Sequence, residues 1–347
     1  MVEAIAPDGM NNVKIVEEPM PELFPGSILC RMTHTLISAG TEIRMIKGCN
    51  GLSDEEIRER DVHLGYCGAG IVEEIKGENS EFSVGERVAV YGGPYVAHRR
   101  YNVVPFHLAV PVPDHVMSEE ASFIGLGAIA LHGIRMARLQ LGEICYIGGL
   151  GIIGNLCVQL SLLSGSRVVA SDFSEKRMEI CVEATGSQVG EATFITPDSA
   201  EEHIRDMTSG RGADTIFLCM AADSAVPMEQ AISLIRFRGN IVILGDLKIH
   251  IPRDDFFYKE ANITTSLAAG PGRYQASYER DGIDYPFPYV RWTEGRNLRE
   301  IMRMISTGRL NIAPLINKKF PFSEAPDCYS SILKGTDDLG FVMEWDI

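Results

Sequence analysis

The stretch Ile144-Cys-Tyr-Ile-Gly-Gly-Leu-Gly-Ile-Ile-Gly154 and the later stretch Arg167-Val-Val-Ala-Ser-Asp172 decide the fold of this chain. The apolar run at 144–147 predicts a buried strand, and an apolar helix is expected over 154–164. A Gly-x-Gly-x-x-Gly turn joins them, and Asp172 ends the next predicted strand. A glycine-rich turn alone is a weak signal, but this order of strand, turn, helix, strand and acid is the context that a dinucleotide site requires.

The glycines of this turn have separate roles in binding a dinucleotide. The first permits the tight turn, the second lets a diphosphate approach the backbone, and the third lets the helix pack closely on the strand. The start of the helix offers free N–H groups and a partial positive charge. The alternative is a structural turn that binds no ligand. We expect the diphosphate at Gly149, Leu150, Gly151, Ile152, Ile153 and Gly154.

The acid that follows the second strand indicates which dinucleotide is bound. Asp172 is expected to accept hydrogen bonds from the adenosine ribose, and its charge would repel the 2′-phosphate of NADP, so the sequence predicts NAD. Lys176 and Arg177 lie nearby in the sequence and could weaken that preference, and we expect Arg177 beside the cofactor. Gly245 and residues 268–270 follow later strands and either border the nicotinamide or form plain turns.

Strands and helices alternate on both sides of this motif. Repeated strand–helix units predict a doubly wound parallel sheet, the arrangement of a Rossmann domain, over 119–269. The expected strands are 144–147, 167–171, 193–195, 213–219 and 240–244, and the expected helices are 154–164, 174–185, 199–208 and 227–235.

The two ends of the chain have a different pattern. Residues 1–118 consist of short apolar runs that glycine and proline interrupt, which predicts a barrel-like or partly open sheet. Residues 270–297 are rich in Gly, Pro, Tyr, Arg and Trp and show no clean period. They precede an expected amphipathic helix at 298–306 and a short strand at 340–343.

Composition excludes several classes of protein. A chain of 347 residues is long enough for two domains. The net charge of −15, with no basic patch longer than His98-Arg99-Arg100, argues against a nucleic-acid partner. None of the 8 cysteines forms a Cys-x-x-Cys pair. Because no apolar leader or long apolar run is present, we expect a cytoplasmic protein without a membrane span.

Three further motifs make the chain resemble the medium-chain dehydrogenase/reductase superfamily. They are Gly40-Thr-Glu42, Gly65-Tyr-Cys-Gly-Ala-Gly70 and Val84-Gly-Glu-Arg-Val88, and they accompany the glycine-rich turn. The resemblance covers nearly the whole chain. It implies a discontinuous β-rich, GroES-like substrate domain at 1–118 and 270–347, and a homodimer or homotetramer that forms through edge strands.

The chain departs from the zinc alcohol dehydrogenases of that superfamily, which carry Cys-Gly-Thr/Ser-Asp and Gly-His-Glu. Aligned on these motifs, Ala39 replaces the cysteine, Tyr66 and Cys67 replace His-Glu, and Leu126 falls near the third ligand. Residues 91–105 also lack the cysteines of the structural zinc lobe. Catalytic zinc needs three protein ligands, so we expect no metal. The alternative ligands are His34, His63, Cys67 and His98.

Two hydroxyl groups are the candidates for acid–base chemistry in place of zinc. Thr41 matches the hydroxyl that relays the substrate proton in the zinc enzymes, and Tyr66 stands at a zinc-ligand position. We expect this pair to hydrogen-bond the substrate oxygen. The alternative for Tyr66 is a packed tyrosine whose hydroxyl has a structural partner.

The aromatic and charged segment at 270–297 suggests the substrate. Aromatic faces beside arginine, glutamate and asparagine suit a sugar or polyol, which has both C–H faces and hydroxyls. With Ser38-Ala-Gly-Thr-Glu and Leu64-Gly-Tyr, the segment resembles a zinc-lacking subgroup associated with carbohydrates. The alternative is an ordered surface loop or a subunit contact. The expected substrate residues are Ser38, Arg273, Tyr274, Arg291, Trp292 and Glu294.

Three functions follow from these features. The first is a zinc-independent, NAD-dependent alcohol dehydrogenase that interconverts a secondary alcohol and a ketone of a sugar, polyol or related carbohydrate. The second is a quinone or enone reductase, against which Asp172 counts because such enzymes often prefer NADPH. The third is a nucleotide-binding protein that has kept the fold and lost the chemistry.

Overall fold

The computed structural model describes residues 1–78, 81–251 and 253–345, and the chain divides into two units. A β-rich unit comprises 1–125, 271–307 and 316–347, and a parallel-sheet unit comprises 126–270 and 308–315. The sequence predicted a β-rich domain at 1–118 and 270–347 and a parallel-sheet domain at 119–269. These domains differ from the two units at three places, which are residues 119–125, 270 and 308–315. They also include residues 79–80, 252 and 346–347, which lie outside the described residues.

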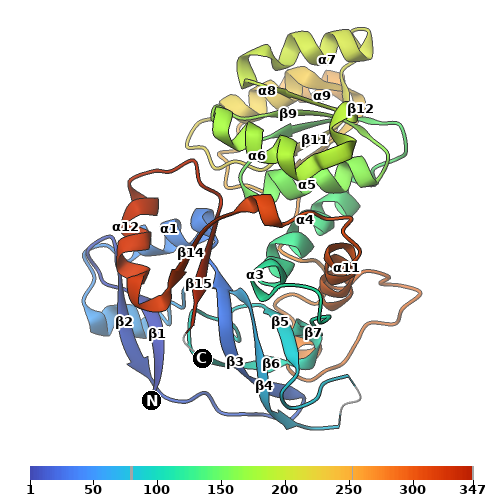
Figure 1. The fold of residues 1–347 in the computed structure, drawn as a ribbon. Helices are drawn as coiled ribbons and strands as arrows, with labels where there is room; N and C mark the ends of the chain where they lie inside the picture. The colour runs from blue at the N-terminus through green and yellow to red at the C-terminus, as the bar shows by residue number, and fades with distance from the viewer. Residues whose placement is uncertain (79–80, 252, 346–347) are drawn as a thin grey trace. The chain divides into compact units, whose positions relative to one another are not determined.

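The parallel-sheet unit contains a sheet of six strands (Figure 1). Their order is β10-β9-β8-β11-β12-β13, and each neighbouring pair is parallel. The chain starts at β8 in the middle, winds outward to β10, and returns past β8 to β13. The strands are β8 (Ile144–Gly148), β9 (Arg167–Ser171), β10 (Ala192–Ile195), β11 (Ala213–Leu218), β12 (Ile235–Ile243) and β13 (Asn262–Thr265).

Different helices cover the two faces of this sheet. Ile144 and Tyr146 of β8 share a buried core with Ile204 of α7 and Met228 of α8. Because side chains alternate along a strand, the intervening residues face the opposite side, where Figure 1 shows α5. The helices are α4 (Ile124–Ala137), α5 (Ile152–Leu163), α6 (Glu175–Thr185), α7 (Ala200–Thr208), α8 (Val226–Leu234) and α9 (Arg253–Lys259).

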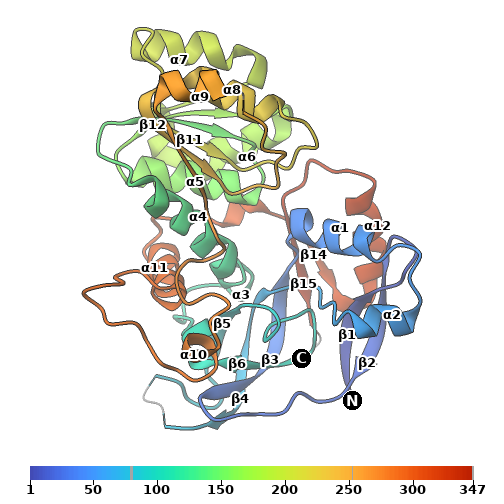
Figure 2. The same ribbon diagram turned by 180° about the vertical axis from the view of Figure 1, so that it is seen from behind.

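The β-rich unit is built on a seven-stranded sheet. Its order is β14-β15-β3-β4-β5-β7, and β6 also pairs with β3 (Figure 2). A separate hairpin joins β1 (Val2–Pro7) to β2 (Val13–Glu18). The strands of the sheet are β3 (Ser27–Leu36), β4 (Cys67–Lys76), β5 (Arg87–Tyr91), β6 (Tyr101–Pro105), β7 (Ala109–Pro111), β14 (Ile316–Pro321) and β15 (Gly340–Glu344).

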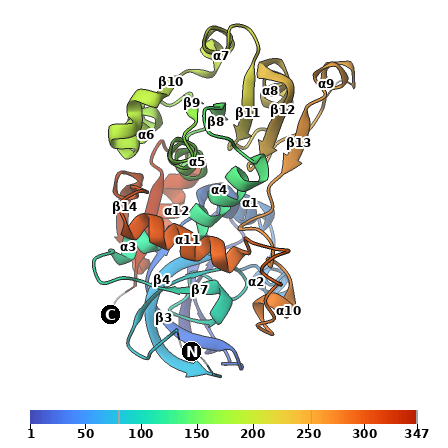
Figure 3. The same cartoon turned by 90° about the vertical axis from the view of Figure 1, so that its right-hand side faces the viewer.

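Short helices connect and flank these strands. Helix α1 follows β3 directly and begins with the Ala-Gly-Thr-Glu segment. Helix α11 contacts β7, as Figure 3 also shows. The helices are α1 (Ala39–Gly48), α2 (Asp54–Glu59), α3 (Ser118–Ala121), α10 (Ala276–Glu279), α11 (Glu294–Ser306) and α12 (Ala325–Leu333).

The structure confirms the expected α/β class, with a parallel-sheet domain of Rossmann type and a separate β-rich domain. Several elements differ from expectation. Strand β12 begins at Ile235 rather than at 240, and helices α1, α9 and α12 were not expected. Helix α11 begins at Glu294 rather than at 298, because the hydroxyl of Thr293 accepts a hydrogen bond from the Arg296 N–H and caps the helix earlier. Strand β13 was not expected, because its four residues carry no alternating pattern. No helix among the described residues is long and apolar enough to cross a membrane.

Candidate functional site

The glycine-rich turn connects β8 to α5 and leaves one position open to a ligand. Gly149 has φ +84° and donates its N–H to the carbonyl of Ser171 at 2.8 Å. A Cβ on Gly154 would lie 1.8 Å from the carbonyl oxygen of Gly149, so only glycine allows this packing. A Cβ on Gly151 would meet no atom within 4 Å. The turn therefore has free space at the N-terminus of α5, where a diphosphate fits.

Asp172 is fixed beside this turn at the end of β9. Its side chain accepts hydrogen bonds from the backbone N–H of Leu150 at 2.7 Å and of Ser174 at 2.9 Å. The guanidinium of Arg177 lies 4.0 Å from the same carboxylate. A carboxylate has about four acceptor sites, so Asp172 keeps acceptor capacity for a ribose hydroxyl. The adjacent Phe173, which we did not expect in the site, is 81% exposed.

Gly245 follows β12 and has a structural reason to be glycine. A Cβ at this position would lie 1.8 Å from the carbonyl oxygen of Met220, in the loop after β11. Met220 also lies against Gly149, where a Cβ would come within 2.9 Å of the Met220 Cβ. The three loops after β8, β11 and β12 are thus packed backbone to backbone at the carboxyl ends of the strands, where open α/β sheets bind ligands.

In the β-rich unit, the structure brings Tyr66 and Thr41, which we expected at the substrate oxygen, together with Ser38, which we expected among the substrate residues. The Tyr66 hydroxyl donates to Ser38 Oγ at 2.6 Å and also hydrogen-bonds the side chain of Thr41. Ser38 is the N-cap of α1, Thr41 lies in its first turn, and Tyr66 immediately precedes β4. Burial raises the pKa of the Tyr66 phenol above its usual value. This hydroxyl cluster can donate and accept hydrogen bonds without bearing a charge.

A buried carboxylate holds the start of α1 in place. Glu42 is fully buried, and its Oε1 accepts the Ser38 N–H at 2.7 Å. Its Oε2 accepts from His98 Nε2 at 3.1 Å and from the hydroxyl of Tyr329. His98 Nδ1 lies 2.8 Å from Thr35 Oγ1. An Nε2–H tautomer of His98 satisfies every one of these contacts. We did not expect this network, which contacts the hydroxyl cluster through the backbone of Ser38.

Arg273, Tyr274 and Glu294 lie in a second cluster of the same unit. The Arg273 guanidinium donates to Glu279 Oε1 at 2.5 Å and to the Gly93 carbonyl at 2.5 Å. Its central carbon lies 4.1 Å from the centre of the Tyr274 ring. Glu294 is fully buried nearby. Glu279 carries no sequence signal, because its role depends on an ion pair that only the fold creates.

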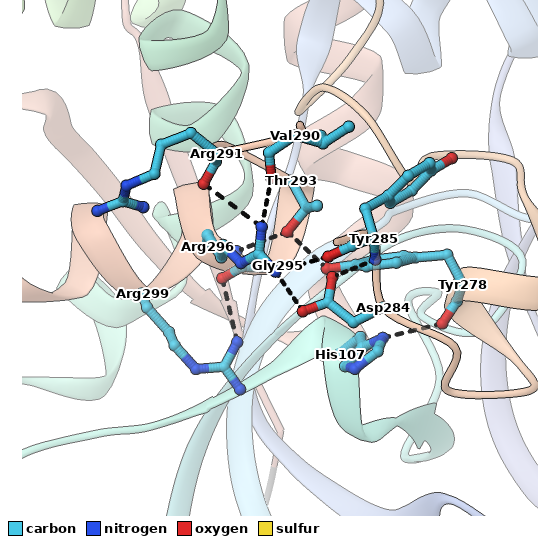
Figure 4. Close-up of polar contacts among 10 residues, drawn as sticks. All are labelled: His107, Tyr278, Asp284, Tyr285, Val290, Arg291, Thr293, Gly295, Arg296 and Arg299. Atoms are coloured by element: carbon cyan, nitrogen blue, oxygen red, sulfur yellow. Dashed lines mark hydrogen bonds and ion pairs between the residues drawn. The ribbon is translucent and has the colours of Figure 1, made fainter. Parts of the chain in front are cut away.

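Arg291 and Trp292 lie on a different segment, 284–292, of which Figure 4 draws Asp284, Tyr285, Val290 and Arg291. Arg296 of α11 holds this segment through bonds to the carbonyl of Val290 at 2.5 Å and to the carboxylate of Asp284 (Figure 4). The Arg291 guanidinium lies 3.7 Å from the centre of the Trp292 ring. The expected substrate residues are thus divided between a buried cluster and an ordered, more exposed segment.

The residues at the family's zinc-ligand positions do not fit catalytic zinc. Ala39 has no donor atom, and the Tyr66 hydroxyl is bonded to Ser38. Cys67 is 1% exposed, and burial raises the pKa of its thiol, which disfavours the thiolate that binds zinc. Catalytic zinc needs three protein ligands.

The alternative ligands have other partners. His34 contacts Thr33, His63 contacts Asp61, and His98 contacts both Glu42 and Thr35. Within residues 1–78, 81–251 and 253–345, no group of three or more His, Cys, Asp or Glu side chains could hold a metal ion.

Comparison with known proteins identifies the relatives of this chain. Residues 153–280 match the family of zinc-binding dehydrogenases. Human sorbitol dehydrogenase is 23% identical over 358 residues, which cover 94% of this chain and 91% of that protein.

Solved structures share the fold. Galactitol-1-phosphate dehydrogenase from Escherichia coli has a TM-score of 0.77 and 17% identity, and it covers 99% of both chains. A structure from Sinorhizobium meliloti 1021 that is bound to NADP has a TM-score of 0.74 and 20% identity, also over 99% of both chains. Residues 153–280 are thus similar to the family of zinc-binding dehydrogenases, the chain aligns with sorbitol dehydrogenase over most of its length, and its fold is that of the solved structures.

Proposed function

We propose that this protein is an NAD-dependent oxidoreductase that interconverts a secondary alcohol and a ketone of a sugar, polyol or related carbohydrate, without a catalytic zinc. The observation that carries the proposal is the position of Asp172, which two backbone N–H groups hold beside the open glycine-rich turn. The alignment with sorbitol dehydrogenase over most of the chain supports the substrate class.

The cofactor would be held by the parallel-sheet unit. The turn from Gly149 to Gly154 would bind its diphosphate, and Asp172 would bind the adenosine ribose, with Arg177 and Gly245 as further contacts. NAD supplies the hydride acceptor when it is bound. The charge of Asp172 favours NAD over NADP, because a 2′-phosphate would face a carboxylate.

The β-rich unit would handle the proton of the substrate oxygen. Since burial raises its pKa, the Tyr66 phenol stays protonated. In this structure it donates to Ser38 Oγ, and we expect the O–H to turn toward the substrate oxygen when the substrate binds. In ketone reduction Tyr66 then passes its proton to the developing alkoxide, while Ser38 or Thr41 passes its own proton to Tyr66 and takes one from water; alcohol oxidation runs the same relay in reverse. This role requires no zinc, because hydrogen bonds to the oxygen replace a Lewis acid.

We further propose that Arg273, Tyr274, Glu294, Arg291 and Trp292 contact the substrate. The first three lie in one cluster next to Gly93, which adjoins Tyr66. The last two lie on the 284–292 segment that Arg296 holds. Aromatic and charged side chains of this kind suit the C–H faces and hydroxyls of a polyol.

The proposed assembly is a homodimer or homotetramer. Strand β13 is an edge of the six-stranded sheet, and an edge strand has unpaired backbone groups that a second copy can use. Light scattering coupled to size exclusion tests this directly, and a monomer at micromolar concentration would contradict it.

The decisive assay mixes the protein with NAD or NADP and a panel of sugars, polyols and enones, and follows the absorbance of the reduced cofactor. Metal content is measured alongside. The proposal expects NAD reduction by a polyhydroxy compound without stoichiometric zinc. Oxidation of NADPH by an enone would replace it with a quinone or enone reductase, and tight NAD binding without turnover would indicate a non-catalytic protein.

Changing Tyr66→Phe tests the proton-handling residue. We expect kcat to fall about 10²- to 10⁴-fold, since one positioned acid–base group contributes that much. NAD affinity, measured by calorimetry, should stay unchanged. An unchanged kcat would leave Tyr66 as a packed tyrosine bonded to Ser38.

A further inference from the structure

The Arg273 guanidinium lies next to the proposed reaction centre within the β-rich unit. It is 7% exposed and donates to the carbonyl of Gly93, and a Cβ on Gly93 would lie 3.9 Å from the Cβ of Tyr66. The guanidinium carbon also lies 5.6 Å from the centre of the Tyr91 ring, whose edge-on partner is Tyr66 at 6.0 Å. Only Gly93 and Tyr91 therefore separate Arg273 from Tyr66, and we take Arg273 as part of the subsite for the substituents of a substrate whose oxygen meets Tyr66.

An arginine at this position would ordinarily select an anionic substituent, such as a phosphate. Here two carboxyl groups, of Glu279 and Glu294, lie beside the guanidinium. Glu279 is 5% exposed and accepts both the guanidinium and the N–H of Tyr274 at 2.9 Å. Glu294 is fully buried at the start of α11, and neither of its oxygens meets a hydrogen-bond donor.

The charge of this cluster is zero or negative in every protonation state that neutral pH allows. With both carboxyls ionised, Arg273, Glu279 and Glu294 sum to −1. Burial and the neighbouring Glu279 raise the pKa of Glu294 to about 9, which makes it a neutral acid and brings the sum to zero. No positive charge remains for a phosphate.

The cluster nevertheless has unused hydrogen-bonding groups. Nε of Arg273 has no partner, and both oxygens of Glu294 lack one. Buried polar atoms without partners are costly, so a group that satisfies them binds favourably. An uncharged hydroxyl can accept a hydrogen bond from Nε and can exchange one with the Glu294 carboxyl. A phosphate dianion has no proton to donate to the carbonyl oxygen of the Glu294 carboxyl, and it would face the negative charge of Glu279.

We propose that Glu279, whose carboxylate neutralises Arg273, and Glu294, whose buried uncharged carboxyl lies beside them, are specificity-determining residues, so that the enzyme takes uncharged polyols and rejects their phosphate esters. This inference rests on the proposed polyol dehydrogenase function. It separates the chain from galactitol-1-phosphate dehydrogenase, which shares the fold at 17% identity.

Two exposed arginines provide the competing way to bind a phosphate. Arg280 lies 5.5 Å from the centre of the Phe24 ring, and Arg291 stacks on Trp292 at 3.7 Å. Neither has a carboxylate in the buried cluster as its ion-pair partner. Because Arg280 has no proposed role in substrate binding, Arg280→Gln serves as the control that removes surface charge and leaves Glu279 and Glu294 unchanged.

The test compares galactitol with galactitol 1-phosphate, which differ only in the phosphate. Binding of each is measured by calorimetry on the wild type, Glu279→Gln, Glu294→Gln and the double variant, with and without saturating NADH. Oxidation of each is then measured with NAD. Melting temperatures show that the variants fold, and Glu279→Asp, which keeps the charge, is the matched control.

We expect the wild type to bind the phosphate ester at least about tenfold more weakly than the polyol, or not at all, because like charges placed together across a site cost several kcal/mol. Glu279→Gln and the double variant should gain about tenfold in affinity for the ester, and Glu279→Asp should not. A wild type that binds the ester as tightly as the polyol would overturn the inference. A double variant that folds but gains no affinity for the ester would also overturn the inference. So would a gain in affinity that Arg280→Gln abolishes.

Failure of the proposed function gives a different result. If the protein neither binds NADH nor oxidises any polyol, the dehydrogenase assignment is lost. The effect of the two carboxyl groups on phosphate affinity is then measured on the protein without cofactor. Galactitol 1-phosphate and inorganic phosphate are titrated into the wild type and the double variant. Equal affinity in those two proteins would overturn the inference.

Discussion

Glu42 and Glu294 are both fully buried in the β-rich unit, but their hydrogen bonding is opposite. The Glu42 carboxylate accepts from a backbone N–H, from a histidine and from a tyrosine. The Glu294 carboxyl meets no donor and lies beside a second acid, Glu279. A buried carboxylate that is fully hydrogen-bonded fixes its surroundings, whereas one without donors favours its neutral form.

This difference separates two roles within one candidate site. Glu42 holds Ser38, and through Ser38 it positions the hydroxyl of Tyr66. It is a positioning residue that does not need to reach the substrate. Glu294 keeps its hydrogen-bonding groups unused next to Arg273, which is typical of a group that awaits a ligand.

The largest effect is expected from Glu42→Ala. This change leaves the Ser38 N–H, His98 and Tyr329 without an acceptor in a buried site, which should lower the free energy of unfolding by about 3–5 kcal/mol. Urea unfolding followed by circular dichroism measures it.

Glu42→Gln is the control, because the amide keeps one acceptor oxygen. It should lose less stability than the alanine variant. If both variants unfolded at the wild-type urea concentration, Glu42 would not anchor this part of the unit.

A smaller loss should follow from Tyr329→Phe, which removes one donor to the Glu42 carboxylate and keeps the ring. Hydrogen bonds to charged groups contribute about 1.5–3 kcal/mol, so a stability loss of that size is expected. The kcat of the dehydrogenase reaction should also fall while KM for the polyol stays near the wild-type value, because Ser38 loses part of its support. A loss of stability with unchanged kcat would make the tyrosine purely structural.

The sequence predicted the parts of the site whose signals are local. The glycine-rich turn and Asp172 lie within one strand–helix–strand unit, where glycine spacing and strand ends determine the geometry. The networks around the two carboxylates could not be predicted in this way. Glu42 and His98 are 56 residues apart, and Glu42 and Tyr329 are 287 apart, so only the tertiary fold brings them together.

The substrate residues show the same limit. Arg273 and Glu294 were expected from the composition of their segment, but the sequence gives no sign that Glu279 neutralises the arginine. The hydroxyl trio was expected from the family resemblance, and the bond from Tyr66 to Ser38 required coordinates. Residue type thus indicates which side chains matter, and tertiary contacts determine their charge and their partners.

The pH dependence of stability should distinguish the two carboxyls. Glu294 has a pKa of about 9 in the folded protein, above its ordinary value of 4.5, so the native state holds a proton that the unfolded state releases. Between these two pH values its contribution to stability therefore falls as the pH rises, by at most about 1.4 kcal/mol per pH unit.

Glu294→Gln should remove that part of the slope, so that the variant is more stable than the wild type at pH 8 and similar to it at pH 5. Urea unfolding at both pH values measures this difference. Parallel pH profiles for the two proteins would show that Glu294 does not hold the proton.

The smallest expected effect lies at the outer end of the Glu42 network. Thr35 Oγ1 accepts from Trp345 Nε1 at 3.1 Å and contacts His98 Nδ1 at 2.8 Å. Thr35→Val keeps the shape and removes both bonds, which should cost about 1 kcal/mol because the groups involved are uncharged. Thr35→Ser keeps the hydroxyl and is the matched control. A loss as large as that of Glu42→Ala would mean that the network acts as one unit, and the carboxylate would then not be its dominant member.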